Sequence, residues 1–293
     1  MPHKILVVDD EIHIRETLEK SLTMMGYTCR TAEDGEEALE RLASEFFDIV
    51  IADIRMPRMD GMALLRAMRQ EHRDVDVIMM TGFGQEHTYM EVIEAGATDF
   101  IAKPFRHEEL QAKVKRVSRE RTLRAELLYL SLHDSLTGLF NRRFLYQKLQ
   151  EEVERAKRQK RDLAMIILDV DHFKEYNDLR GHLDGDQLLA GLSQTLTSFI
   201  RQNVDTVYRY GGDEFAILLI EADISQARSI AERIRRAFEA KHIDRCTLSL
   251  GVAQLQPKGN PEDLIRMADE AMYRAKRAGG NRVEEFDPSR NTP

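Results

Sequence analysis

The chain has 293 residues, a formal net charge of −8 and 42% hydrophobic residues, which suggests about two domains. The acidic balance argues against a general nucleic-acid or membrane binder, because no basic excess attracts phosphate polymers. No apolar run is long enough to span a bilayer, no signal-peptide pattern is present, and Cys29 and Cys246 lie far apart, so we expect a cytoplasmic protein without a disulfide framework or zinc site.

Four strand-like runs in the first part of the chain lead to polar residues. The runs cover 5–8, 48–52, 77–80 and 100–102, and helix-like stretches separate them. Continuous apolar strands separated by helices indicate a parallel sheet covered on both faces, in which ligands bind beyond the carboxyl ends of the strands. The polar residues at those ends are Asp9, Asp10, Asp53, Thr81 and Lys103.

Three carboxylates gathered at one sheet edge need a cation. Two unit charges about 4 Å apart interact by roughly 4 kcal/mol at an effective dielectric near 20. Mg²⁺ relieves such repulsion and orients an incoming phosphoryl group, while a lysine pairs with the new charge and a hydroxyl bonds its oxygens. The alternative is an acidic surface cluster around a doubly wound sheet.

Residues 1–120 resemble a bacterial response-regulator receiver domain, which implies a doubly wound parallel sheet of five strands. The resemblance implies that Asp53 accepts a phosphoryl group from a histidine kinase, and that Asp9 and Asp10 help it to hold Mg²⁺ or Mn²⁺. The remaining implied positions are Arg55 (a metal ligand through its backbone carbonyl), Thr81 (the switch hydroxyl), Phe100 (the aromatic switch) and Lys103 (the lysine before Pro104).

The stretch 108–133 contains no Gly or Pro and favours a helical linker that continues the last receiver helix. It carries two apolar triplets with the spacing of coiled-coil a and d positions, and the heptad phase slips between them. The triplets are Leu110, Val114 and Val117, then Leu123, Leu127 and Leu130. We expect the linker to pair with a second copy and to transmit a change at Asp53. The alternative is a helix packed on its own domain, followed by a plain linker.

In the second part, a strand that ends in acids and a hairpin that carries acids stand out. The strand at 166–168 leads to Asp169 and Asp171, and Gly211-Gly212-Asp213-Glu214 lies between apolar runs at 206–208 and 215–220. Glycine permits a tight turn and the close approach of a ligand, and neighbouring acids suit a divalent cation with its phosphates. For the hairpin alone, the alternative is a solvated acidic turn.

Together with Asp134-Ser135-Leu136-Thr137-Gly138-Leu139 and Asn141-Arg142-Arg143, these segments resemble the GGDEF family of diguanylate cyclases over 134–286. The resemblance implies a domain at 134–288 with an α/β fold and a mainly antiparallel central sheet, and we expect a flexible tail at 289–293. It also implies a homodimer in which each domain holds one GTP. The two nucleotides are condensed to cyclic di-GMP with release of two pyrophosphates.

The same resemblance implies roles for individual residues. The metal, Mg²⁺ or Mn²⁺, is held by Asp169, Asp213, Glu214 and the backbone carbonyl of Val170, and Asp213 and Glu214 are also catalytic. The phosphates are held by His172, Phe173, Lys174 and Lys276, the guanine by Asn177 and Asp186, and the hairpin turn is formed by Gly211 and Gly212. Read without the resemblance, Lys276 is a solvated helix residue and Asp186 is a helix N-cap.

Two positions depart from the family pattern. Gly280 stands where the family often has an arginine that touches phosphate, with Arg277 and Arg282 nearby as substitutes. The family's inhibitory site has an Arg-x-x-Asp motif, which here reads Gln202-Asn203-Val204-Asp205, with Arg201 one position too early. We therefore expect a degenerate inhibitory site and weak or absent product feedback.

The leading interpretation is a phosphorylation-activated diguanylate cyclase. The alternative is a catalytically silent domain that binds GTP or cyclic di-GMP and passes the signal to a partner. The presence of Asp169, Asp213 and Glu214 favours catalysis, since degenerate domains usually lose acids at the metal site. The guanine-reading pair argues against a different nucleotidyl transferase with two-metal chemistry.

Overall fold

The computed structural model describes residues 3–82 and 89–287, and the chain forms two compact units, Met1–Glu126 and Leu127–Pro293. The tail predicted at 289–293 lies outside the described residues. Within the described part of the chain, no helix is both long and apolar enough to cross a membrane.

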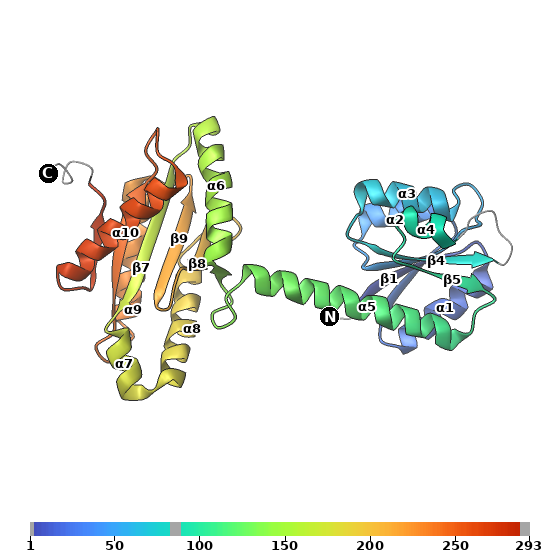
Figure 1. The fold of residues 1–293 in the computed structure, drawn as a ribbon, viewed down its shortest axis with the longest axis horizontal. Helices are drawn as coiled ribbons and strands as arrows, with labels where there is room; N and C mark the ends of the chain where they lie inside the picture. Colours follow the sequence, from blue (N-terminus) through green and yellow to red (C-terminus); the bar gives the residue numbers. More distant parts are fainter. Residues whose placement is uncertain (1–2, 83–88, 288–293) are drawn as a thin grey trace. The chain divides into compact units, whose positions relative to one another are not determined.

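The first unit contains a parallel five-stranded sheet with the order β2-β1-β3-β4-β5 (Figure 1). Its strands are β1 (Lys4–Val8), β2 (Thr28–Ala32), β3 (Ile49–Asp53), β4 (Asp76–Gly82) and β5 (Asp99–Lys103). Its helices are α1 (Ile12–Met24), α2 (Gly35–Ser44), α3 (Gly61–Glu71), α4 (Tyr89–Glu94) and α5 (His107–Leu132). One hydrophobic core joins the sheet to α2 and α3, and a second joins it to α1 and α5. The doubly wound parallel fold predicted from the sequence is therefore confirmed.

The two apolar triplets of α5 have different environments. Leu110, Val114 and Val117 are buried in the core that they share with α1 and the sheet. The second triplet is exposed to solvent, and Leu127 has 68% of its surface accessible. Ion pairs add to the docking of α5, because Arg116 lies 2.7 Å from the carboxylate of Asp99. Only the second triplet is therefore free of the receiver's own core.

The second unit contains a six-stranded sheet with the order β11-β10-β7-β9-β8-β6. The strands are β6 (Phe140–Asn141), β7 (Leu163–Asp171), β8 (Thr206–Arg209), β9 (Glu214–Ile220), β10 (Thr247–Gln254) and β11 (Arg282–Glu285). The three central pairings are antiparallel and the two edge pairings are parallel. The mainly antiparallel sheet predicted from the sequence is confirmed.

Helices cover both faces of this sheet (Figure 1), and all nine residues of β7 between them are buried. The helices are α6 (Arg142–Gln159), α7 (Phe173–Arg180), α8 (His182–Ser198), α9 (Ile224–Glu239) and α10 (Pro261–Arg277). The core with α6 and α10 contains the β7 residues Leu163, Met165 and Ile167, and the core with α8 and α9 contains Ala164, Ile166, Leu168 and Val170. A Cβ on Gly251 would lie 2.1 Å from the Ala268 carbonyl oxygen, so α10 packs directly on β10. This contact fixes the helix that carries Lys276.

Candidate functional site

The three receiver acids come together at the carboxyl edge of the first sheet. The register pairs Val8 with Ala52, so the ends of β1 and β3 are adjacent. Ligand atoms of Asp9, Asp10 and Asp53 all lie within 4.8 Å of one another. Among the described residues, no other group of three His, Cys, Asp or Glu side chains meets that distance. This donor set of oxygens suits Mg²⁺.

Lys103 joins two of these acids. Its Nζ lies 2.8 Å from Asp9 Oδ2 and 2.7 Å from Asp53 Oδ2. Burial raises the pKa of Asp53 against the opposing influence of Lys103, and the neighbouring Asp9 adds to the rise. Burial opposes the charge on Lys103, but the two carboxylates keep the pKa of Lys103 above its ordinary value. One ammonium group therefore serves two buried acids, and the negative charge that remains favours a divalent cation.

The other predicted receiver residues lie at different distances from this cluster. Thr81 is half-buried near the end of β4, one residue beyond the partner of Asp53 in the register. Arg55 is exposed in the loop after β3. Phe100 is the second residue of β5, where its ring lies 5.3 Å from Lys113 Nζ. Thr81 is thus at the sheet edge that holds the acids, whereas Phe100 is not.

In the second unit, the hairpin of β8 and β9 brings its acids to the end of β7. Asp169 and Glu214 are partners in the β7–β9 register, and Val170 donates its N–H to the Asp213 carbonyl at 3.3 Å. Neither Gly211 nor Gly212 has a positive φ, but a Cβ on Gly211 would lie 2.7 Å from Glu214 Oε2. Because that oxygen is at the end of a flexible side chain that can move aside, neither a left-handed φ nor this contact requires glycine at position 211.

Asp169 is the buried centre of this second site. Its Oδ2 lies 2.6 Å from Lys276 Nζ, whereas its Oδ1 is buried and has no hydrogen-bond partner among the described residues. Burial raises the pKa of Asp169 to about 6; Lys276 opposes the rise, while Asp213 and Glu214 add to it. A buried carboxylate oxygen without a partner, beside two further acids, fits a divalent cation.

The predicted phosphate-binding turn follows β7 directly. His172 has a φ of +61° and precedes α7, and its Nδ1 lies 3.2 Å from Glu175 Oε1. Phe173 packs against the core, whereas Lys174 is exposed. The turn therefore presents the N–H groups at the start of α7 beside a solvent-facing lysine, an arrangement suited to phosphate.

The predicted guanine-reading residues lie on two helices that meet at Gly181. Asn177 is on α7, and its buried Oδ1 has no hydrogen-bond partner within the part of the chain that the structure describes. A Cβ on Gly185 would lie 1.8 Å from that oxygen, so Gly185 allows the close contact of α7 with α8. Asp186 is exposed on α8, which begins at His182. The N-cap reading of Asp186 is therefore wrong, because Gly181 occupies the N-cap position and Asp186 lies within the helix.

Asp171 holds a buried network that sequence reasoning missed. Its carboxylate accepts hydrogen bonds from Thr247 Oγ1 (2.7 Å), Ser249 Oγ (2.6 Å) and the Asn281 N–H (3.0 Å). A Cβ on Gly280 would lie 2.9 Å from Asp171 Oδ2, and Gly280 has a φ of +72°. Asp171 therefore anchors the turn after α10. The alternation of Thr247 and Ser249 on one face of a strand was a usable signal for it.

The two candidate substitutes for an arginine at position 280 differ in placement. Arg282 donates from Nε to the Gly280 carbonyl at 3.3 Å, so its side chain folds back onto this turn. Arg277 is exposed at the last residue of α10.

Hydrogen bonds also tie the hairpin to the start of the second unit. Arg209 donates to both carboxylate oxygens of Asp134 and to the Gly212 carbonyl at 2.8 Å. On the next residue, the Tyr210 ring lies 4.5 Å from the Arg142 guanidinium. Asp134 and Arg142, which follow α5, thus contact the two residues that precede the hairpin turn.

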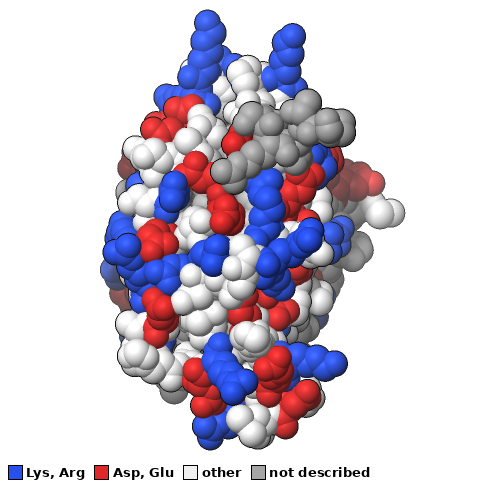
Figure 2. All heavy atoms as spheres, turned by 90° about the vertical axis from the view of Figure 1, so that its left-hand side faces the viewer, with Lys and Arg blue, Asp and Glu red and all other residues white. Residues whose placement is uncertain are grey.

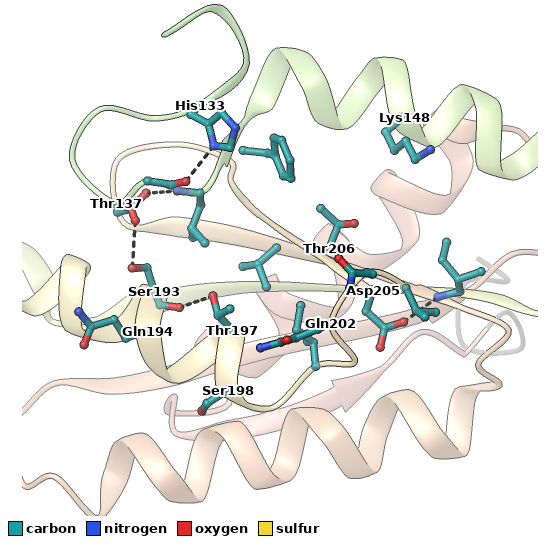
Figure 3. Close-up of a pocket in the computed structure, with 18 of the residues that line it drawn as sticks. His133, Thr137, Lys148, Ser193, Gln194, Thr197, Ser198, Gln202, Asp205 and Thr206 are labelled. Atoms are coloured by element: carbon teal, nitrogen blue, oxygen red, sulfur yellow. Dashed lines mark hydrogen bonds between the residues drawn. The ribbon is translucent and has the colours of Figure 1, made fainter. Parts of the chain in front are cut away.

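The predicted inhibitory residues line a cavity of about 1070 Å³ between α6, α8 and the start of β8 (Figure 3). Arg201 contacts both oxygens of Asp205, at 2.9 Å from Nε to Oδ2 and 2.7 Å from Nη2 to Oδ1. The Ile220 N–H donates to the same carboxylate at 3.1 Å. The Asp205 carboxylate is therefore already bound by groups of its own chain, and Gln202 contributes no charge to the cavity.

Lys, Arg, Asp and Glu side chains are interspersed over the face shown in Figure 2, without a single broad basic area. No broad basic field on that face therefore attracts an anionic nucleotide.

Two family models match the chain. The model for "Diguanylate cyclase, GGDEF domain" matches residues 131–282, and that for "Response regulator receiver domain" matches residues 5–115. The curated Response regulator PleD of Caulobacter vibrioides is 32% identical over 299 aligned positions, covering 96% of this chain and 65% of PleD. Diguanylate cyclase DosC of Escherichia coli is 45% identical over 163 positions, covering 53% of this chain and 35% of DosC. The chain therefore spans less than two thirds of either relative.

Solved structures resemble the second unit. The coiled coil and GGDEF domain of DgcB from Caulobacter crescentus, in complex with c-di-GMP, has a TM-score of 0.57 at 27% identity, covering 61% of this chain and 97% of that one. Diguanylate cyclase SiaD of Pseudomonas aeruginosa, in complex with its activator SiaC, has a TM-score of 0.51 at 33% identity. The match covers 61% of this chain and 74% of the SiaD chain.

Proposed function

The chain belongs to the GGDEF-domain family of diguanylate cyclases and carries a receiver domain ahead of that domain, and we propose that it is a phosphorylation-activated diguanylate cyclase. Two copies each hold one GTP. The 3′-hydroxyl of each nucleotide attacks the α-phosphate of the other, so that cyclic di-GMP forms and two pyrophosphates leave. One observation carries this proposal: Asp169 pairs with Glu214 in the β7–β9 register, and its buried Oδ1 has no hydrogen-bond partner in residues 3–82 and 89–287.

In this proposal Asp169, Asp213 and the Val170 carbonyl hold Mg²⁺ or Mn²⁺, and a bound divalent cation neutralises charge on the reacting phosphates. Glu214 completes the site, as a further ligand or as the group that accepts the proton of the attacking hydroxyl. The hairpin register supports this set, because it brings acids from two distant sequence segments to one strand end.

The phosphates and the guanine are held by the two helices that follow β7. Lys174, Lys276 and the turn at His172 and Phe173 bind the phosphates. Asn177 and Asp186 read the guanine, since a carboxylate accepts hydrogen bonds from guanine N1–H and N2–H that adenine does not offer. The meeting of α7 and α8 at Gly181 supports this assignment.

Control comes from the receiver. Asp53 accepts a phosphoryl group from a histidine kinase, and Asp9 and Asp10 hold a divalent cation with it and the Arg55 carbonyl. Lys103 pairs with the added charge, and Thr81 and Phe100 switch position. We further propose that the exposed triplet of α5 pairs with a second copy, because the first triplet is already buried in the receiver core. Product feedback through Asp205 is weak or absent, since Arg201 already engages that carboxylate.

The test is product identification. The purified full chain is incubated with GTP and Mg²⁺, and the products are separated by chromatography and identified by mass. We expect cyclic di-GMP and pyrophosphate, with no product from Asp213→Asn or Glu214→Gln. GTP that binds in a metal-dependent manner but is not converted would instead support the silent binding domain.

A further inference from the structure

Lys276 lies where it contacts a proposed metal ligand directly. It is in the last turn of α10, with its Nζ 2.6 Å from Asp169 Oδ2. The lysine side chain is 37% exposed, whereas that of Asp169 is 6% exposed. The ammonium group of Lys276 is therefore able to move into solvent, whereas the Asp169 carboxylate that it contacts is held inside the protein.

Asp169 depends on this contact for charge compensation. Its other oxygen, Oδ1, is buried and receives no hydrogen bond from the described residues. An ionised carboxylate that is buried without partners is strongly disfavoured. The acids of the second unit also lie farther apart than the receiver trio, whose ligand atoms are all within 4.8 Å of one another. Lys276 thus balances the negative charge of Asp169 in an arrangement where Asp169, Asp213 and Glu214 lie farther apart than the receiver acids.

A divalent cation at Asp169 Oδ1, the oxygen that receives no hydrogen bond from the described residues, would share one carboxylate with the ammonium group of Lys276 at Oδ2. Two positive charges on the same partly buried carboxylate repel each other strongly. A free metal ion therefore either bears this repulsion or displaces the ammonium group and leaves it unpaired. A metal ion that arrives with a triphosphate brings phosphate oxygens to which the displaced ammonium group can transfer.

We propose that Lys276 selects the metal–nucleotide complex over the free metal ion, by occupying Asp169 until phosphate oxygens replace that carboxylate as its partner. This inference rests on the proposed function, in which Asp169 is a metal ligand. It gives Lys276 two opposite effects: it weakens binding of the metal alone and strengthens binding of the metal together with the nucleotide.

The test measures both effects on the full chain. Mn²⁺ is titrated by calorimetry, first alone and then with a non-reactive α,β-methylene analogue of GTP. Lys276→Gln is compared with Arg266→Gln, at an exposed position nearer the start of the same helix, which removes the same charge. Asp169→Asn identifies which binding event belongs to the second unit, since the receiver acids also bind Mn²⁺.

For Lys276→Gln we expect Mn²⁺ alone to bind the Asp169 site roughly tenfold more tightly, and Mn²⁺ with the analogue roughly tenfold more weakly. Arg266→Gln should change either affinity less than about twofold. Unchanged or weaker binding of Mn²⁺ alone in Lys276→Gln would overturn the proposal, as would an equal gain in Arg266→Gln. Absence of analogue binding in every variant would count against the cyclase function, and the Mn²⁺ titration would still decide the role of Lys276.

Discussion

The Arg209 guanidinium lies 3.0 and 3.1 Å from the two carboxylate oxygens of Asp134. Asp134 is two residues beyond the end of α5, and Arg209 is the last residue before the hairpin loop. Thr137 also donates to Asp134, from its N–H and its hydroxyl. The pair therefore joins the segment after the linker helix to the loop that carries Asp213.

Breaking this pair should reduce turnover while leaving nucleotide binding largely intact. Asp134→Ala leaves Arg209 without its carboxylate partner and loosens the hairpin, so we expect kcat to fall several-fold with a smaller change in KM. Steady-state kinetics with GTP measure both constants. Glu126→Ala, a substitution of an exposed acid in α5, serves as the control. Wild-type kcat in Asp134→Ala would show that the pair does not position the hairpin.

Docking of α5 on the receiver should depend on the ionisation of Asp99. Although burial opposes its charge, hydrogen bonds from Arg116, the Phe100 N–H and Lys113 hold the pKa of Asp99 below its ordinary value. Because the folded-state pKa is depressed, this stabilisation is present above the unfolded pKa, near 3.9, and is lost as pH falls through the folded value.

We therefore expect Asp99→Asn to lower the melting temperature at pH 7, and the difference from wild type to shrink as the pH falls below about 4. Thermal unfolding followed by circular dichroism at several pH values measures the difference. Asp74→Asn, at an exposed acid, should show little difference at any of these pH values. A gap between Asp99→Asn and wild type that is constant with pH would contradict this origin.

A side chain at position 280 should disturb the turn after α10. Gly279 and Gly280 both have positive φ, so replacing either with alanine strains the backbone. Only at Gly280 would the new Cβ meet Asp171. The carboxylate of Asp171 is held in place by three hydrogen bonds. We expect Gly280→Ala to lower the melting temperature more than Gly279→Ala does and to raise KM for GTP, because this turn follows Lys276. Equal effects would show that Asp171 moves aside.

Guanine selection should depend on Asp186. Asp186→Ser removes the carboxylate that accepts from guanine and leaves room at an exposed position of α8. We expect GTP turnover to fall and ATP to become a substrate, which competition between the two nucleotides and analysis of the products would measure. Strict use of GTP by this variant would refute the assignment.

Much of the architecture is encoded in local patterns. Runs of apolar residues that end in acids predict strand ends, and parallel pairing then brings Asp9 and Asp53 together without further information. The same reasoning places Asp169 opposite the hairpin acids, because the Gly-Gly-Asp-Glu segment between two strands predicts the turn.

What the sequence could not predict depends on contacts between distant segments. Nothing local indicates that Lys276 contacts Asp169 or that Arg209 contacts Asp134, since each pair depends on how elements pack. The start of α8 was misjudged because Gly181, with its φ of +88°, allows a helix to begin before the apolar residues that mark it. Likewise, the regular spacing of α5 does not distinguish a triplet buried in the receiver from an exposed one.

The measurement that tests the central proposal most directly is the rate of cyclic di-GMP formation from GTP and Mg²⁺, with and without beryllofluoride, which mimics a phosphoryl group on Asp53. We predict a rate that rises with beryllofluoride in the wild type and does not respond to it in Asp53→Asn. GTP that remains bound and unconverted under both conditions would contradict the account, as would an equal rise in Asp53→Asn.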